Sequence, residues 1–166
     1  MSCQPGQVNK VYQWLINQQP CLLCDGPSHR SLALCEDCEA ELPWLSGQCR
    51  QCALPMPNQQ ALCADCTDNP PMYSQVVTPL QFDFPVDTLI SRFKYQQRWP
   101  YGRLLSALLV QYLTYYFDEG GQRPDLILAV PLAKRRQRQR GYNQAQMICE
   151  WLRKALGLHN PQQLLL

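Results

Sequence analysis

The sequence predicts a chain in two parts: a cysteine-rich N-terminal half and an α/β C-terminal half. Four Cys-x-x-Cys pairs recur every fourteen residues between Cys21 and Cys66. After residue 85 the pattern changes to helix, strand, basic turn and helix, which is typical of α/β folds. The charge changes sign as well: residues 1–70 carry three cations and seven acids, whereas residues 71–166 carry twelve cations and six acids.

The composition indicates a globular protein with much irregular structure. Apolar residues make up 46% of the 166 positions, charged residues 17%, and there are 14 prolines. No apolar run follows a basic start, so no signal peptide is predicted. The most apolar stretch, residues 104–117, is too short to cross a bilayer. We therefore expect a soluble, cytoplasmic protein without a membrane span.

Three segments are predicted along the chain. Within residues 1–20, apolar side chains between Val8 and Ile16 have helical spacing, which predicts a short amphipathic helix that ends before Pro20. Residues 21–70 hold the cysteine pairs and end at the linker sequence Asn-Pro-Pro, 69–71. Residues 71–166 form the α/β part.

The cysteine pairs predict two structural zinc sites. A Cys-x-x-Cys turn, here called a knuckle, presents two sulfurs to one tetrahedral ion, and two knuckles complete a four-sulfur site. The predicted ligands are Cys21, Cys24, Cys35, Cys38, Cys49, Cys52, Cys63 and Cys66. Four knuckles pair in three ways. Pairing along the sequence closes the shortest loops and would give two consecutive zinc ribbons.

Other uses of the cysteines fit less well. A disulfide framework is typical of secreted chains, and a redox Cys-x-x-Cys normally occurs once beside a βαβ unit. Cys3 and Cys149 lie outside the four Cys-x-x-Cys pairs, and we expect both to be ordinary thiols. Eight thiolates with two Zn²⁺ would make the net charge of the first half more negative. Because a negative surface repels phosphates, we expect the zinc ribbons to be structural or to contact proteins rather than DNA.

The C-terminal half is predicted to alternate strands and helices. Short strands are expected at 73–77 and 80–84, and a third, more apolar one at 126–130. One helix should begin near Pro85, a second should begin at Pro100 and stop at Gly120-Gly121, and a third should run from about Asn143 to Leu156 with Gly157 as its cap. The sheet formed by such strands would place a ligand site at the strands' carboxyl ends.

The most charged stretch lies between the third strand and the last helix. Five cations fall within the seven residues 134–140, and Gly141 ends the run. A cation-rich loop between a strand and a helix start is a good place to hold an anion. The alternatives are a solvated charged loop and a patch that contacts nucleic acid without sequence preference.

Two stretches of this half carry a family resemblance. Residues 89–95, Leu-Ile-Ser-Arg-Phe-Lys-Tyr, and residues 124–145, which include Arg-Gln-Arg-Gly-Tyr-Asn-Gln-Ala, resemble the ComF/GntX family. That family is linked to natural competence and the use of external DNA. Its members join a double zinc ribbon to a type I phosphoribosyltransferase domain. The resemblance implies that residues 71–166 are the first part of such a domain.

The resemblance also implies roles for individual residues. The turn that binds pyrophosphate in type I phosphoribosyltransferases matches Val130, Pro131 and Leu132, and Mg²⁺ would bridge the ligand's oxygens. A mobile loop that closes over the substrate would follow, with Gly141 as its hinge. Its cations would be Arg136, Arg138 and Arg140, of which Arg138 and Arg140 are the candidate catalytic residues because fixed positive charge stabilises a departing pyrophosphate.

Three further residues are candidates for the same cleft. Asn143 and Gln144 could cap the last helix or contact a phosphate, and we favour capping for Asn143. Lys94 could reach the cleft or could be a cation at a helix end that complements the helix dipole.

One family feature is missing from the sequence. Type I phosphoribosyltransferases hold the ribose phosphate with two adjacent acids followed by a Thr-Gly-x-Thr loop, and no such stretch occurs here. We therefore expect a truncated member or a fragment, whose open sheet edge would favour self-association.

The sequence leaves two functions open. The first is a phosphoribosyltransferase-like protein that binds phosphoribosyl pyrophosphate or a similar anion and is not catalytically complete. The second is a zinc-ribbon adaptor without enzymatic activity, which contacts single-stranded DNA or competence proteins.

Overall fold

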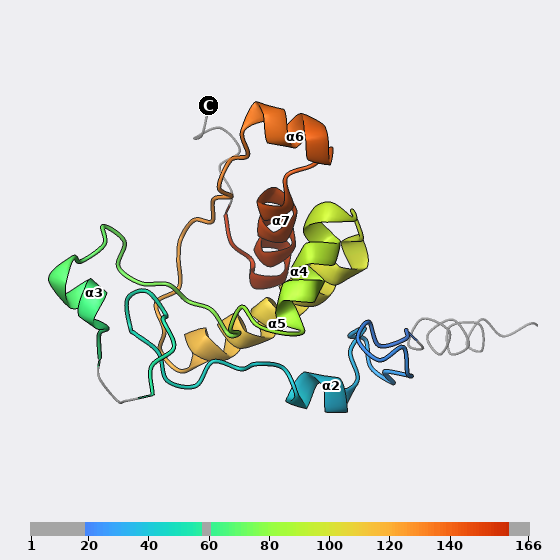
Figure 1. Cartoon of the computed structure of the whole chain (residues 1–166), viewed down its shortest axis with the longest axis horizontal. Helices are drawn as coiled ribbons and strands as arrows, with labels where there is room; N and C mark the ends of the chain where they lie inside the picture. Colours follow the sequence, from blue (N-terminus) through green and yellow to red (C-terminus); the bar gives the residue numbers. More distant parts are fainter. Residues whose placement is uncertain (1–18, 58–60, 160–166) are drawn as a thin grey trace, which may run out of the picture. The chain divides into compact units, whose positions relative to one another are not determined.

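The computed structural model describes residues 19–57 and 61–159. They form two compact units: one joins the chain up to Glu41 with the chain from Leu89 onward, and the other is Leu42–Thr88. The expected helix between Val8 and Ile16 lies outside the described residues, and so does Cys3. Figure 1 labels the helices, which are α2 (Glu36–Ala40), α3 (Ala64–Asp68), α4 (Val86–Tyr95), α5 (Trp99–Asp118), α6 (Lys134–Arg140) and α7 (Gln144–Leu156).

Helices α5 and α7 pack against each other and form an apolar core cluster of the first unit. Leu152, Leu156 and Leu158 are buried there, and α5 contributes Leu109 and Leu113. Both helices carry apolar residues at three- and four-residue spacing, so each buries one face. The helix boundaries agree with the sequence prediction within a residue or two, and Pro100 lies in the first turn of α5.

No sheet forms among residues 19–57 and 61–159, so the α/β class is not confirmed. The described residues contain only isolated β-bridges. The expected strand at 126–130 makes one parallel bridge, between Leu126 and His159, where the Ile127 N–H donates to the His159 carbonyl at 3.1 Å. A strand persists only where a neighbour takes up its backbone groups, and here the neighbour is a single residue.

The expected strands at 73–77 and 80–84 are also irregular. Leu80 pairs with Trp44 in one antiparallel bridge, flanked by a 2.8 Å hydrogen bond from Leu45 to Pro79. The Gln81 N–H donates to the Pro43 carbonyl at 2.9 Å. The prolines lack N–H groups and so keep this ladder short.

The basic stretch differs most from the prediction, because residues 134–140 are helix α6 rather than a loop. Its sequence, Lys-Arg-Arg-Gln-Arg-Gln-Arg, consists only of good helix formers. Gly141 ends the helix in the left-handed conformation, with φ of 77°. Gly141 is thus a helix cap.

Of the described helices, none has both the length and the apolar character that a bilayer crossing requires.

Candidate metal centres and anion pocket

The eight cysteines of the four knuckles gather in two groups. Consecutive knuckles pair, which is the pairing that loop length favoured. Within each group the four sulfur atoms lie within 4.8 Å of one another. The groups are Cys21, Cys24, Cys35 and Cys38, and Cys49, Cys52, Cys63 and Cys66. Each group belongs to a different compact unit, so the chain carries two separate four-cysteine sites.

The two sites are built alike. The N–H of Cys21 donates to the Gly26 carbonyl at 2.7 Å, and 28 positions later the N–H of Cys49 donates to the Leu54 carbonyl at 2.9 Å. In both sites the third cysteine is the N-cap of a five-residue helix, with φ of −75° and ψ of 163°. These repeated contacts hold the cysteine backbones of the two sites in the same arrangement.

The spacing of the sulfurs fits zinc. With zinc–sulfur bonds of about 2.3 Å, the sulfurs of a regular tetrahedron lie about 3.8 Å apart. The Sγ atoms of Cys24 and Cys35 are 3.8 Å apart, and those of Cys52 and Cys63 are 3.7 Å apart. Since four sulfur donors in a tetrahedron are typical of structural zinc, both groups are zinc sites closed by protein ligands.

The electrostatics of the sites favour a cation. Backbone N–H groups, chiefly that of Cys52, hold the pKa of Cys49 at about 6 despite burial. Burial would raise the pKa of Cys21, but N–H donors led by that of Cys24 lower it to about 6. Burial and the neighbouring sulfurs raise the pKa of Cys38 and Cys66. Four clustered thiols therefore cannot all ionise alone, and a divalent ion supplies the missing charge.

A separate group of contacts joins the end of α4 to the start of α7. The Tyr142 hydroxyl donates to the Phe93 carbonyl, and their rings are 5.9 Å apart. Gln144, which is 5% exposed, donates from Nε2 to the Lys94 carbonyl at 3.3 Å. The two stretches that resemble the ComF/GntX family, 89–95 and 124–145, thus contact each other directly.

Arg140 is held between the same two segments. Its guanidinium lies 5.1 Å from the centre of the Tyr95 ring and donates to Oε1 of Gln144 at 3.3 Å. Its carbonyl accepts a hydrogen bond from Nε2 of Gln97 at 3.3 Å. A cation–π contact and a hydrogen bond together orient the guanidinium.

A cavity of about 230 Å³ opens beside Arg140. It is lined by three cations and three polar or aromatic residues: Lys94, Arg136 and Arg140, with Tyr95, Gln97 and Gln139. None of these lining residues is acidic. A cluster of cations without counter-charges attracts anions, and the guanidinium fork suits phosphate oxygens, so this cavity is a candidate anion site.

The other predicted ligands do not line this cavity. Arg138 is exposed on α6, and Val130 is 77% exposed at the end of its extended segment. Pro131 is exposed and Leu132 is partly buried, both before α6. The described structure brings Lys94, Arg136 and Arg140 together and leaves the predicted pyrophosphate turn apart.

Asn143 caps a helix, as favoured from the sequence. Its Oδ1 accepts from the N–H groups of Ala145 and Gln146 at 3.0 and 3.4 Å, and its Nδ2 donates to the Val130 carbonyl at 3.3 Å. Gln144 does not line the cavity, and its side-chain amide contacts the Lys94 carbonyl and the Arg140 guanidinium. Cys149 is buried, and its Sγ lies 3.8 Å from the Ile127 carbonyl, consistent with a core thiol.

Sequence reasoning missed Tyr95, Gln97 and Gln139 as lining residues. Tyr95 belongs to the stretch 89–95 that resembles the family and directly follows the candidate residue Lys94. This position could have indicated Tyr95 as a lining residue. Gln139 was hidden because the basic stretch was expected to be a loop, whereas helical spacing puts it on the face shared by Arg136 and Arg140.

Comparison with protein families matches residues 11–67 to the double zinc ribbon domain. Among curated proteins, the chain is 32% identical to the DNA utilization protein YhgH of Salmonella typhimurium over 139 residues, covering 82% of this chain and 61% of that protein. It is 32% identical to YhgH of Escherichia coli K12 over 138 residues, with the same coverages. It is 29% identical to Competence protein F of Haemophilus influenzae over 143 residues, covering 83% of this chain and 56% of that protein.

The chain therefore spans roughly three-fifths of the length of the curated relatives that it matches. No solved structure matches it significantly. The double zinc ribbon has its eight ligands in place, and the relatives match 82% of the chain, which extends the similarity beyond the ribbon into the C-terminal half. The chain belongs to the ComF/GntX family.

Proposed function

We propose that the chain serves DNA utilisation or competence and binds an anion of the pyrophosphate class between α4 and α6. The support for DNA utilisation is the names of its relatives, DNA utilization protein YhgH and Competence protein F. The support for anion binding is one observation: Lys94, Arg136 and Arg140 line one cavity, although Lys94 lies more than forty positions before the two arginines.

The cavity's surroundings favour an anion as well. Between Thr88 and Phe117 the sequence contains no acid, and none occurs between Leu126 and Cys149. These two stretches supply α4 after Asp87, α5 before Asp118, all of α6 and the start of α7. An anion at the cavity therefore meets several cations from stretches of sequence that carry no carboxylate, and its binding should weaken as salt rises.

The family resemblance narrows the ligand to pyrophosphate or phosphoribosyl pyrophosphate, with Mg²⁺ across its oxygens. Fixed guanidinium groups stabilise charge that develops on pyrophosphate as it departs from a ribose carbon. In this proposal the Arg140 guanidinium provides that fixed charge, because its contacts with the Tyr95 ring and with Gln144 orient it. Arg138, on α6 but not in the cavity lining, would act only if α6 moves over the ligand.

Calorimetry with three ligands tests this proposal. Pyrophosphate and phosphoribosyl pyrophosphate with Mg²⁺ should bind at one site per chain, and a short single-stranded oligonucleotide should bind more weakly. A preference for the oligonucleotide that disappears by about 200 mM salt would instead favour a backbone-binding patch.

The second candidate is an adaptor whose ribbons contact a protein partner. The observation that favours it is an acidic surface beside the knuckles of each unit: Glu36 and Asp37 of α2 are exposed in one, and Asp65 and Asp68 of α3 in the other. Such a surface repels a phosphate backbone and suits a basic protein surface. Absence of pyrophosphate binding, together with capture of a basic partner that needs zinc, would support this candidate.

A further inference from the structure

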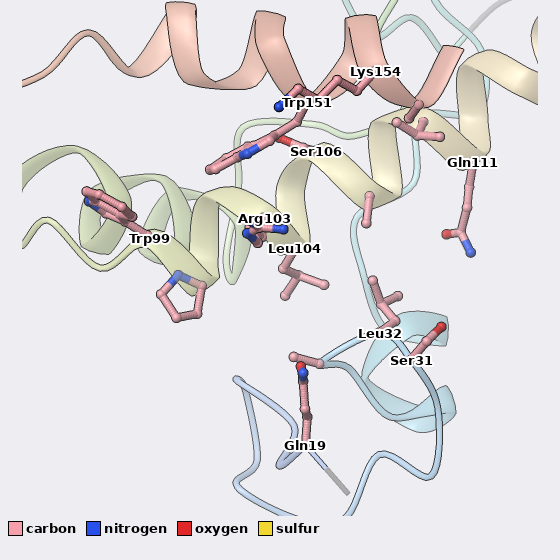
Figure 2. Close-up of a pocket in the computed structure, with 15 residues that line it drawn as sticks. Gln19, Ser31, Leu32, Trp99, Arg103, Leu104, Ser106, Gln111, Trp151 and Lys154 are labelled. Carbon is pink, nitrogen blue, oxygen red and sulfur yellow. The ribbon is translucent and has the colours of Figure 1, made fainter. Parts of the chain in front are cut away.

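A second, larger cavity lies along α5 and takes no part in the anion pocket. Its volume is about 870 Å³, at the upper end of the range for small-molecule sites. One wall is α7, and the facing wall is the loop that carries Ser31, Leu32 and Ala33, as Figure 2 shows. All of these segments belong to the same compact unit. No lining residue is shared with the smaller cavity.

Small side chains on α5 make room for a ligand in this cavity. Ser106 and Ala107 line it one helical turn after Arg103, and Val110 follows one turn later. Ser106 is 3% exposed and its hydroxyl donates to the Gly102 carbonyl at 2.8 Å, so its polar atom is already satisfied within the helix. This part of the surface is therefore apolar in character, and it favours a flat apolar group.

Two tryptophans contribute aromatic surface. Trp151 reaches from α7 towards α5 in Figure 2, and Trp99 stands at the start of α5 with 56% of its surface exposed. A large indole that is half exposed beside an apolar hollow gains free energy when a ring covers it. Leu32 points towards α5 from the facing loop in Figure 2 and closes the hollow from that side.

Two cations complete the lining. The guanidinium of Arg103 lies 5.4 Å from the centre of the Trp151 ring, which restricts its position. Lys154 follows Trp151 by one helical turn on α7 and is exposed. No acidic residue lines the cavity. The ligand should therefore carry a negative charge as well as a planar ring.

We propose that this cavity binds a nucleotide, with its base against the tryptophans and its phosphate at Arg103 and Lys154. The side-chain amides of Gln19 and Gln111 also line the cavity and offer donors and acceptors to the edge of a base. The site lies apart from the proposed pyrophosphate pocket and does not depend on it. Base stacking and a charge-assisted phosphate contact are the two interactions that the lining supplies.

Calorimetric titration of the zinc-loaded full chain with adenosine 5′-monophosphate tests the proposal. We expect one saturable site, with weaker binding of adenosine, which lacks the phosphate, and of inorganic phosphate, which lacks the ring. Arg103→Gln and Lys154→Gln should each weaken binding about tenfold, the usual scale for a hydrogen bond to a charged group. Arg50→Gln, which removes an exposed cation of the other unit, should leave binding unchanged.

Two further variants keep the test independent of folding and of the pyrophosphate pocket. Ala155 is exposed and lines the cavity, so Ala155→Glu should repel the phosphate without disturbing the core. Arg136→Gln should leave nucleotide binding intact, because Arg136 lines only the smaller cavity. The proposal is overturned if the nucleotide fails to saturate below about 10 mM, a weak limit for a specific small-molecule site. It is also overturned if Arg136→Gln abolishes binding while Arg103→Gln and Ala155→Glu do not.

Discussion

The hydroxyl of Tyr142 donates a hydrogen bond to the main-chain carbonyl of Phe93, 49 positions earlier in the chain. The contact joins the two stretches whose sequences resemble the ComF/GntX family. Gln144 makes a parallel contact with the carbonyl of Lys94. Together they bring the end of α4 to the start of α7 and place Lys94 beside Arg140. The two resembling stretches thus contact each other beside the cavity that Lys94 and Arg140 line.

Removing the Tyr142 hydroxyl should destabilise this junction. Tyr142→Phe keeps the ring packing on Phe93 but leaves the carbonyl without this donor, which costs about 1 to 2 kcal/mol. The shift of the urea unfolding midpoint measures the loss. Tyr115→Phe, at an exposed ring on α5, is the matched control and should change stability little. Equal effects of the two changes would contradict a structural role for the Tyr142 hydroxyl.

The same residue gives a pH dependence. Burial raises the pKa of Tyr142 above its usual value near 10. Because the folded-state pKa exceeds the unfolded-state value, its contribution to stability is complete below pH 10 and is lost as pH rises through the raised pKa. We expect the difference in unfolding free energy between wild type and Tyr142→Phe to shrink above pH 10. A difference that grows with pH would contradict the assignment.

Each zinc site should lose its ion independently. Cys66→Ala removes one ligand of the second site, so the chain should bind one zinc per molecule instead of two, as measured by native mass spectrometry. Cys149→Ala, at a buried thiol outside both groups, should retain two. Loss of both ions from Cys66→Ala would mean that the sites fold as one unit.

A chelator should reduce helical circular dichroism and protease resistance in the wild type.

Asn143 should act as a helix cap rather than as a ligand. Asn143→Ala leaves the N–H groups of Ala145 and Gln146 without their acceptor and should cost about 1 kcal/mol. Asn143→Ser should restore most of that stability because serine also caps helices. Pyrophosphate affinity should change less than twofold in both variants. A large loss of affinity in the serine variant would assign Asn143 to the ligand.

Local signals in the sequence predicted part of this structure well. The knuckle spacing predicted both four-cysteine groups, and loop length favoured the observed pairing. The positions of Asn143 and Gly157 in the sequence predicted where α7 begins and ends, because helix capping depends only on residues close by in the sequence. The strands were not predictable in the same way, since a strand depends on a partner that local sequence does not specify.

The cavity lined by Lys94, Arg136 and Arg140 was predictable only in part. Charge density pointed to residues 134–140 and the family resemblance pointed to Lys94, but neither indicated that the basic stretch is a helix. Helical spacing separates Arg136 and Arg140, which line the cavity, from Arg138, which does not. The large cavity along α5 left no local signal, because its walls come from segments far apart in the chain.

The most direct test of the account measures pyrophosphate binding, with Mg²⁺ present, to the wild type and to paired charge-removal variants. Lys94→Gln and Arg140→Gln should each lower affinity about tenfold, while Arg135→Gln, on the same helix but outside the cavity lining, should lower it less than twofold. Equal losses from Arg135→Gln and Arg140→Gln, or no binding by the folded wild type, would contradict an anion pocket between α4 and α6.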